Sequence, residues 1–88
     1  MIAAAVLATP GVHGLHAGAG GEIATYLPGR RVSGVRQLEN GYDVHVVLAW
    51  GYPVMGTAEA VRAAVQQVVP GRVDVTIADV AAAGEHDS

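Results

Sequence analysis

The four histidines and the absence of cysteine set the limits on any metal chemistry of this 88-residue chain. His13 and His16 have the His-x-x-His spacing that allows two imidazoles to share one metal ion. Zinc needs four ligands, each oriented by further hydrogen bonds. Only His45, His86 and scattered acids are left to complete such a set. We therefore predict histidines in turns and at strand ends, with no metal and no cofactor, and no disulfide.

Few side chains are available for nucleophilic catalysis. The serines are Ser33, in a predicted strand, and Ser88, at the end of the chain, and Thr25 has no suitably spaced histidine and acid to activate it. Three aspartates occur in predicted strands and are expected to be solvated: Asp43, Asp74 and Asp79. We predict that the chain is not an enzyme, has no catalytic residues and has no small-molecule substrate.

The glycine-rich segment 17–21 is the place where a phosphate-binding loop would be sought. It lacks the Gly-Lys-Ser/Thr of a P-loop, and Ile23 occupies the position of the third glycine of a dinucleotide fingerprint. The composition is typical of a flexible link between strands.

Two aromatic residues, Trp50 and Tyr52, flank Gly51 at the end of a predicted strand. Rigid aromatic side chains that stay partly exposed are typical anchors of protein interfaces. Arg30 and Arg31 would supply a polar rim. These four residues are the predicted partner surface.

The arginines also suggest RNA binding as an alternative. Arg30, Arg31 and Arg36 are close in sequence, and 11–14 has the Gly-x-x-Gly pattern of KH domains, whose element order is distantly similar. The formal net charge of −3 opposes nucleic-acid binding, which needs a positive field. A small KH-like RNA-binding domain therefore stays the second hypothesis.

The first half of the chain predicts short elements. Ile2–Ala8 is rich in helix formers and stops at Pro10 and Gly11, and two short strands follow, Val12–His16 and Glu22–Leu27, the latter closed by a turn at Pro28 and Gly29. Val32–Leu38 and Tyr42–Trp50 flank Asn40-Gly41, which favours positive φ at both central positions of a tight hairpin. In the second strand large apolar residues, ending with Trp50, alternate with small or polar ones.

The second half predicts a helix and a final strand. Thr57 is expected to cap the helix, and Ala58, Val61, Val65, Val68 and Val69 form one apolar stripe on it. The helix ends at Pro70-Gly71 and is about as long as the strands. It can therefore return the chain through a right-handed crossover, so that Arg72–Val80 runs parallel to Tyr42–Trp50.

These elements predict a small two-layer α+β domain over residues 1–80. A mixed three- to four-stranded sheet has the short N-terminal helix and the longer helix on one face. Residues 81–88 are expected to be a disordered C-terminal tail. The apolar opening, residues 1–8, has no positive n-region and is too short for a signal peptide, so a buried helix and no direct membrane contact are expected.

Several segments, in this order and spacing, resemble the short, high-GC members of the alkaline shock protein family of envelope stress response proteins. They are Val6–Val12 leading to Gly14–His16, Glu22–Val32, Val44–Val47, Gly51–Val54, Ala60–Arg62 with Val65, and Val73–Val80. The resemblance implies a non-enzymatic, self-associating scaffold in the cytoplasm, held near the membrane by a membrane-anchored partner protein.

Overall fold

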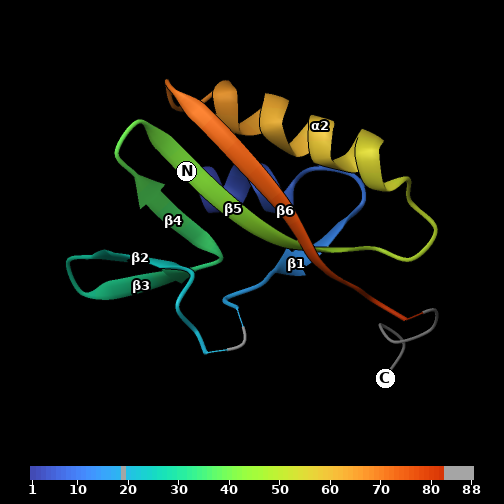
Figure 1. Cartoon of the computed structure of the whole chain (residues 1–88), viewed down its shortest axis with the longest axis horizontal. Coiled ribbons are helices and arrows are strands. Elements are labelled where there is room, and N and C mark those ends of the chain that lie inside the picture. Colours follow the sequence, from blue (N-terminus) through green and yellow to red (C-terminus); the bar gives the residue numbers. More distant parts are fainter. Residues whose placement is uncertain (19, 83–88) are drawn as a thin grey trace.

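The central strand of the molecule, β5 (Gly41–Leu48), pairs with strands from both halves of the chain. The computed structural model describes residues 1–18 and 20–82, apart from the side chains of Leu27 and Arg30. Within that part the chain forms two helices and six strands (Figure 1). This is the predicted α+β class.

The two edges of β5 are occupied differently. β6 (Arg72–Val80) runs parallel to β5 along its whole length. On the other edge, β4 (Val35–Leu38) and β1 (Val12–Leu15) pair antiparallel with the first and last halves of β5. The two meet at His45, whose N–H donates to the carbonyl oxygen of Gly34 and whose oxygen accepts from the N–H of His16, both at 2.9 Å. The mixed sheet and the parallel last strand are confirmed.

Both helices, α1 (Ile2–Leu7) and α2 (Val54–Gln66), pack on one face of the sheet. The buried cluster between them consists entirely of valines, one from α1, two from α2, two from β5 and one from β6: Val6, Val61, Val65, Val44, Val46 and Val73. Full burial of one valine side chain stabilises the fold by about 1.5–3 kcal/mol. The core therefore depends on many small contacts.

The hairpin between β4 and β5 forms as predicted, but its turn differs. Leu38 pairs with Gly41, so the loop is Glu39-Asn40, and neither Asn40 nor Gly41 has the positive φ expected for an Asn-Gly turn. A Cβ at Gly41 would lie 1.8 Å from the carbonyl oxygen of Arg72. Glycine is needed there because β6 comes this close.

The predicted strand Val32–Leu38 is divided in two. Gly34, with φ +85°, separates β3 (Arg30–Ser33) from β4, and β3 pairs instead with β2 (Ala24–Leu27) in a separate two-stranded hairpin. The turn at Pro28 and Gly29 is confirmed, and Gly29 has the positive φ of a type II turn. Arg30 and Arg31 are thus strand residues.

Two other boundaries were predicted wrongly. The strand β5 ends at Leu48, which leaves Trp50 in a turn. The helix α2 begins at Val54 with Pro53 as its N-cap, so Thr57 is not a cap. The side chain of Thr57 is instead buried against Gly11, where a Cβ would lie 2.8 Å from its Oγ1.

The packed structure extends one residue past the predicted end of the domain. Ala81 is buried, and its N–H donates to the carbonyl oxygen of Leu48 at 2.9 Å. Ala82 is exposed, and the rest of the predicted tail, residues 83–88, lies outside the described residues.

Candidate functional site

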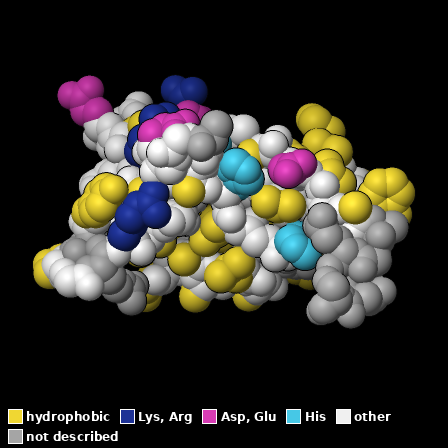
Figure 2. All heavy atoms as spheres, turned by 90° about the horizontal axis from the view of Figure 1, so that it is seen from below, with side chains coloured by type: hydrophobic (Ala, Val, Ile, Leu, Met, Phe, Trp, Pro, Cys, Tyr) yellow, Lys and Arg dark blue, Asp and Glu magenta, His cyan; other side chains and the backbone are white. Residues whose placement is uncertain are grey.

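The turn between β5 and α2 carries a group of exposed apolar side chains, which we call the aromatic turn: Trp50, Tyr52, Val54 and Met55. Their exposed fractions range from 47% for Tyr52 to 76% for Met55. They are half of the eight large exposed hydrophobic residues in the described part of the chain. Figure 2 shows hydrophobic side chains gathered at the end of the molecule where this turn lies, on the right.

Backbone contacts hold the aromatic turn in place. The N–H of Ala49 donates to the carbonyl oxygen of Gly11 at 2.7 Å, and the N–H of Tyr52 donates to that of Ala49 at 3.3 Å. Gly51 takes a φ of +90°, which lets the chain reverse before Pro53 starts the helix. The apolar side chains are therefore presented on a fixed backbone, which lowers the entropic cost of binding.

The predicted polar rim is not beside the aromatic turn. Arg30 and Arg31 lie in β3, and Figure 1 places the β2–β3 hairpin at the opposite end of the long axis from the turn before α2. The side chain of Arg30 lies outside the described part of the structure. The structure brings together Trp50 and Tyr52 but separates them from the arginines.

Arg31 forms a small cluster of its own on the hairpin. Its Nε donates to the Tyr26 hydroxyl at 3.3 Å, its Nη1 donates to Ser33 Oγ at 2.8 Å, and its Nη2 donates to the carbonyl oxygen of Gly21. The guanidinium carbon lies 5.9 Å from the centre of the Tyr26 ring. These contacts fix the hairpin to the preceding loop.

One of the aspartates is buried, contrary to the prediction. Asp43 is only 8% exposed, on the sheet face away from the helices. Its Oδ2 accepts from Arg36 Nη2 at 2.8 Å, and His45 Nε2 lies 3.2 Å away. Arg36 is its cross-strand partner in β4 and His45 follows two residues later in β5, so all three side chains share one face. The arrangement is an ion pair that joins β4 to β5.

The carboxylate of Glu22 is hydrogen-bonded to the glycine-rich loop that precedes it. Glu22 Oε1 accepts from the N–H of Gly20 at 2.9 Å. Hydrogen bonds from the backbone N–H groups of Glu22 and Gly20 hold the pKa of the Glu22 carboxyl below its ordinary value, and Arg36 and His45 lower it further. In the same loop His16 Nδ1 accepts from the N–H of Gly18 at 3.0 Å.

His13 and His16 are not gathered with further ligands. His13 is exposed on β1, whereas His16 is bound into the loop. In residues 1–18 and 20–82, no group of three or more His, Asp or Glu side chains is placed to hold a metal ion.

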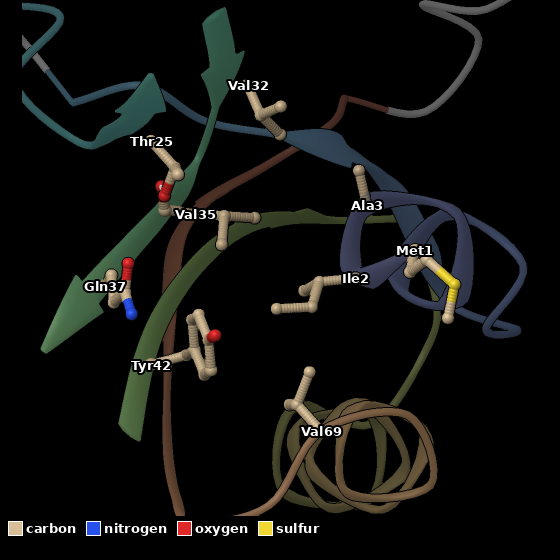
Figure 3. A pocket seen from close by; sticks show the side chains of 9 residues that line it. All are labelled: Met1, Ile2, Ala3, Thr25, Val32, Val35, Gln37, Tyr42 and Val69. Carbon is tan, nitrogen blue, oxygen red and sulfur yellow. Dashed lines mark hydrogen bonds between the residues drawn. The ribbon is translucent and has the colours of Figure 1, made fainter. Parts of the chain in front are cut away.

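A pocket of about 300 Å³ lies on the helix side of the sheet, beside the valine core. It is lined by residues of α1, β2, β3, β4 and β5 and by one residue beyond α2 (Figure 3). Sequence reasoning missed it, because it interpreted the apolar N-terminus only as a buried helix.

Comparison of the chain with known protein families, curated proteins and solved structures finds no match. Among the described residues, no helix is long and apolar enough to cross a membrane.

Proposed function

We propose that this chain is a non-enzymatic protein-interaction domain that binds a partner protein through the aromatic turn. The observation behind the proposal is the exposure of four large apolar side chains within six consecutive residues, Trp50–Met55. The centres of protein interfaces are enriched in Trp, Tyr and Met and depleted of charge. From Val46 to Ala58 the chain has no acidic, basic or histidine residue, so the turn matches that composition.

The aromatic turn has the properties of an interface hot spot. Trp and Tyr side chains contribute large contact areas and have few rotatable bonds, so ordering them on binding costs little. Here the backbone is already fixed by its hydrogen bonds to Gly11 and Ala49. We expect Trp50 and Met55, the two most exposed side chains of the turn, to enter the partner surface.

The resemblance to the alkaline shock protein family supports a specific setting for this interaction. We propose a scaffold of the envelope stress response in the cytoplasm, which self-associates and is held near the membrane by a membrane-anchored partner. The segment Gly51–Val54, which belongs to the aromatic turn, is part of that resemblance. The partner of the aromatic turn is, on this proposal, the membrane-anchored protein.

The arginines give RNA binding less support than protein binding. Three of the four arginine side chains that the structure describes pair with carboxylates: Arg36 with Asp43, Arg62 with Glu59, and Arg72 with Asp74. Paired arginines attract phosphates less strongly than free ones. The Gly-x-x-Gly segment also runs into β1, where Gly14 pairs with Val47.

The test is affinity purification of the tagged chain from its native cells, with detergent-solubilised membranes and with or without nuclease. We expect one nuclease-resistant membrane protein, which is lost from the Trp50→Ser/Met55→Ser double variant. The control is Tyr26→Ser, which replaces an equally exposed aromatic residue at the opposite end and should retain that protein. Retention by the double variant, with unchanged circular dichroism, would contradict the proposal. Companions that disappear on nuclease treatment would favour RNA binding.

A further inference from the structure

The pocket beside the core has walls from four parts of the fold. Ile2 projects from α1, Val35 and Tyr42 from the sheet, and Val69 from the segment after α2, and Figure 3 shows all four pointing into a common space. Val32 of the β2–β3 hairpin and Ala3 of α1 line it further. The pocket therefore lies where α1, the hairpin and the sheet converge.

The pocket exists because the side chains around it are small. The helix α1 is six residues long and contributes an alanine, Ala3, whose side chain is a single methyl group. The sheet and the end of α2 contribute only valines and the ring of Tyr42 to the apolar wall. Apolar groups around such a space lose dispersion contacts that a ligand would restore.

The polar groups of the pocket are concentrated on one wall. Gln37 and Tyr42 are directly opposed in the β4–β5 register, so an amide and a phenol lie next to each other. Thr25 is the third polar lining residue, and its Oγ1 donates to the carbonyl oxygen of Val35 at 2.6 Å. The nine lining residues include no Asp, Glu, Lys, Arg or His. A charged ligand would lose part of its hydration there, and no lining side chain carries a charge that would compensate for the loss.

We propose that this pocket binds an uncharged, largely apolar small molecule with a single hydrogen-bonding group. Ile2, Val35 and Val69 hold its hydrocarbon part, and Gln37 and Tyr42 bind its polar group. An apolar cavity of about 150 Å³ is enough to bind benzene. A pocket of about 300 Å³ takes a molecule of two fused or linked rings or a comparable alkyl compound. This is a ligand site separate from the aromatic turn, not a site of catalysis.

Binding would also stabilise α1. A helix of two turns is marginal without packing, and here the ligand adds packing on the side of Ile2 and Ala3. A ligand that binds only the folded state raises the melting temperature by mass action. We therefore expect slower hydrogen exchange of the hydrogen-bonded amides of α1, in residues 5–8, with ligand present.

The test uses two fluorescent probes that differ by one charge. N-phenyl-1-naphthylamine is neutral, with one N–H, and 1-anilinonaphthalene-8-sulfonate is the same molecule with a sulfonate. Titration of the purified full chain should show one saturable site for the neutral probe and at least about tenfold weaker binding of the sulfonate. Nuclear Overhauser effects from the probe to the methyl groups of Ile2 and Val35 should locate it.

Variants separate the pocket from the aromatic turn. Ala3→Leu fills the pocket with a residue that favours helix. It should weaken the binding of the neutral probe by about tenfold or more. Gln37→Leu, at an exposed position, removes the polar partner and provides a second measurement if Ala3→Leu does not fold. Trp50→Ser should leave the affinity unchanged.

Three results would overturn the proposal. The first is equal binding of both probes. The second is loss of neutral-probe binding in Trp50→Ser and not in Ala3→Leu, which would place the probe's binding site on the aromatic turn. The third is loss of the co-purifying protein in Ala3→Leu, with circular dichroism unchanged, which would make the pocket part of a protein interface.

Discussion

The two ends of the molecule present apolar groups in opposite ways. At one end the aromatic turn points its side chains outward from a fixed backbone, and at the other α1, the hairpin and the sheet surround a hollow. On our proposals, the first surface binds another protein and the second binds a small molecule. The difference shows that a small apolar core can leave two kinds of apolar surface, one where large side chains project outward and one where small side chains leave a pocket unfilled.

The largest expected effect comes from a change that disrupts the pairing of β5 with β6, on which both ends of the molecule depend. Gly41→Ala places a methyl group 1.8 Å from the carbonyl oxygen of Arg72, so β5 and β6 must move apart. We expect a loss of roughly 3 kcal/mol or more in the free energy of unfolding, measured by urea denaturation. The control is Gly14→Ala, also in a strand but with nothing within 4 Å of the added methyl, which should change it by about 0.5 kcal/mol or less. Equal effects would contradict the close approach of β6.

A change at Gly11 should disturb both the aromatic turn and the first turn of α2. Gly11 has φ +96°, and a Cβ there would lie 2.8 Å from Thr57 Oγ1 and 2.9 Å from the ring of Tyr52, so Gly11→Ala combines backbone strain with a clash. We expect a loss of about 1–3 kcal/mol in unfolding free energy and weaker partner binding, with the neutral probe still bound in the pocket. Gly51→Ala has similar strain at φ +90° but open space, so its loss should be about 1 kcal/mol.

A smaller effect concerns the face away from the helices. Arg36→Met removes the partner of Asp43 but keeps the apolar stem, and His45 still contacts the carboxylate. Because Arg36 is about half exposed, we expect a loss of only about 0.5–1 kcal/mol, which high salt should reduce. Binding at both ends of the molecule should be unaffected. A change in pocket affinity would show that the two faces are coupled.

The smallest effect is a pH dependence at the end with the pocket. The Glu22 carboxyl has a lowered pKa in the folded chain, so its stabilising contribution is present above the unfolded pKa of about 4.3 and is lost as the pH falls through the folded value. Arg31 ties this loop to the hairpin, whose Val32 lines the pocket. In the wild-type chain, the protection of the hairpin amides against hydrogen exchange should therefore fall between pH 5 and about pH 3. In Glu22→Gln, which has no carboxyl to protonate at this position, the protection should fall less over the same range. An unchanged pH profile would contradict the role of Glu22.

Patterns that are local in sequence predicted the correct elements. The alternation in Tyr42–Leu48 and the valine stripe with Val61 and Val65 identified β5 and α2, and the length of α2 predicted a parallel β6. The patterns failed where contacts join distant residues. Gly34 bends the chain where it meets Leu15, and Thr57 turns inward because Gly11 leaves space for it.

The candidate sites were predictable only in part. The exposure of Trp50 and Tyr52 agrees with the expectation of an aromatic anchor, but the position of Arg31 depends on the hairpin, which the sequence pattern did not separate from β4. The burial of Asp43 depends on its register with Arg36. The pocket results from missing side-chain volume between α1, the β2–β3 hairpin, the sheet and the segment after α2, which no single segment of the sequence reveals.

The central position of β5 has a consequence for how the chain is made. Its two edges are completed by β1, near the beginning of the chain, and by β6, which ends at Val80. Contacts between residues so far apart in sequence slow folding, because the entropy of the long intervening loops must be lost before the contacts form. A nascent chain on the ribosome therefore cannot complete its valine core until Val73 and the rest of β6 have been synthesised.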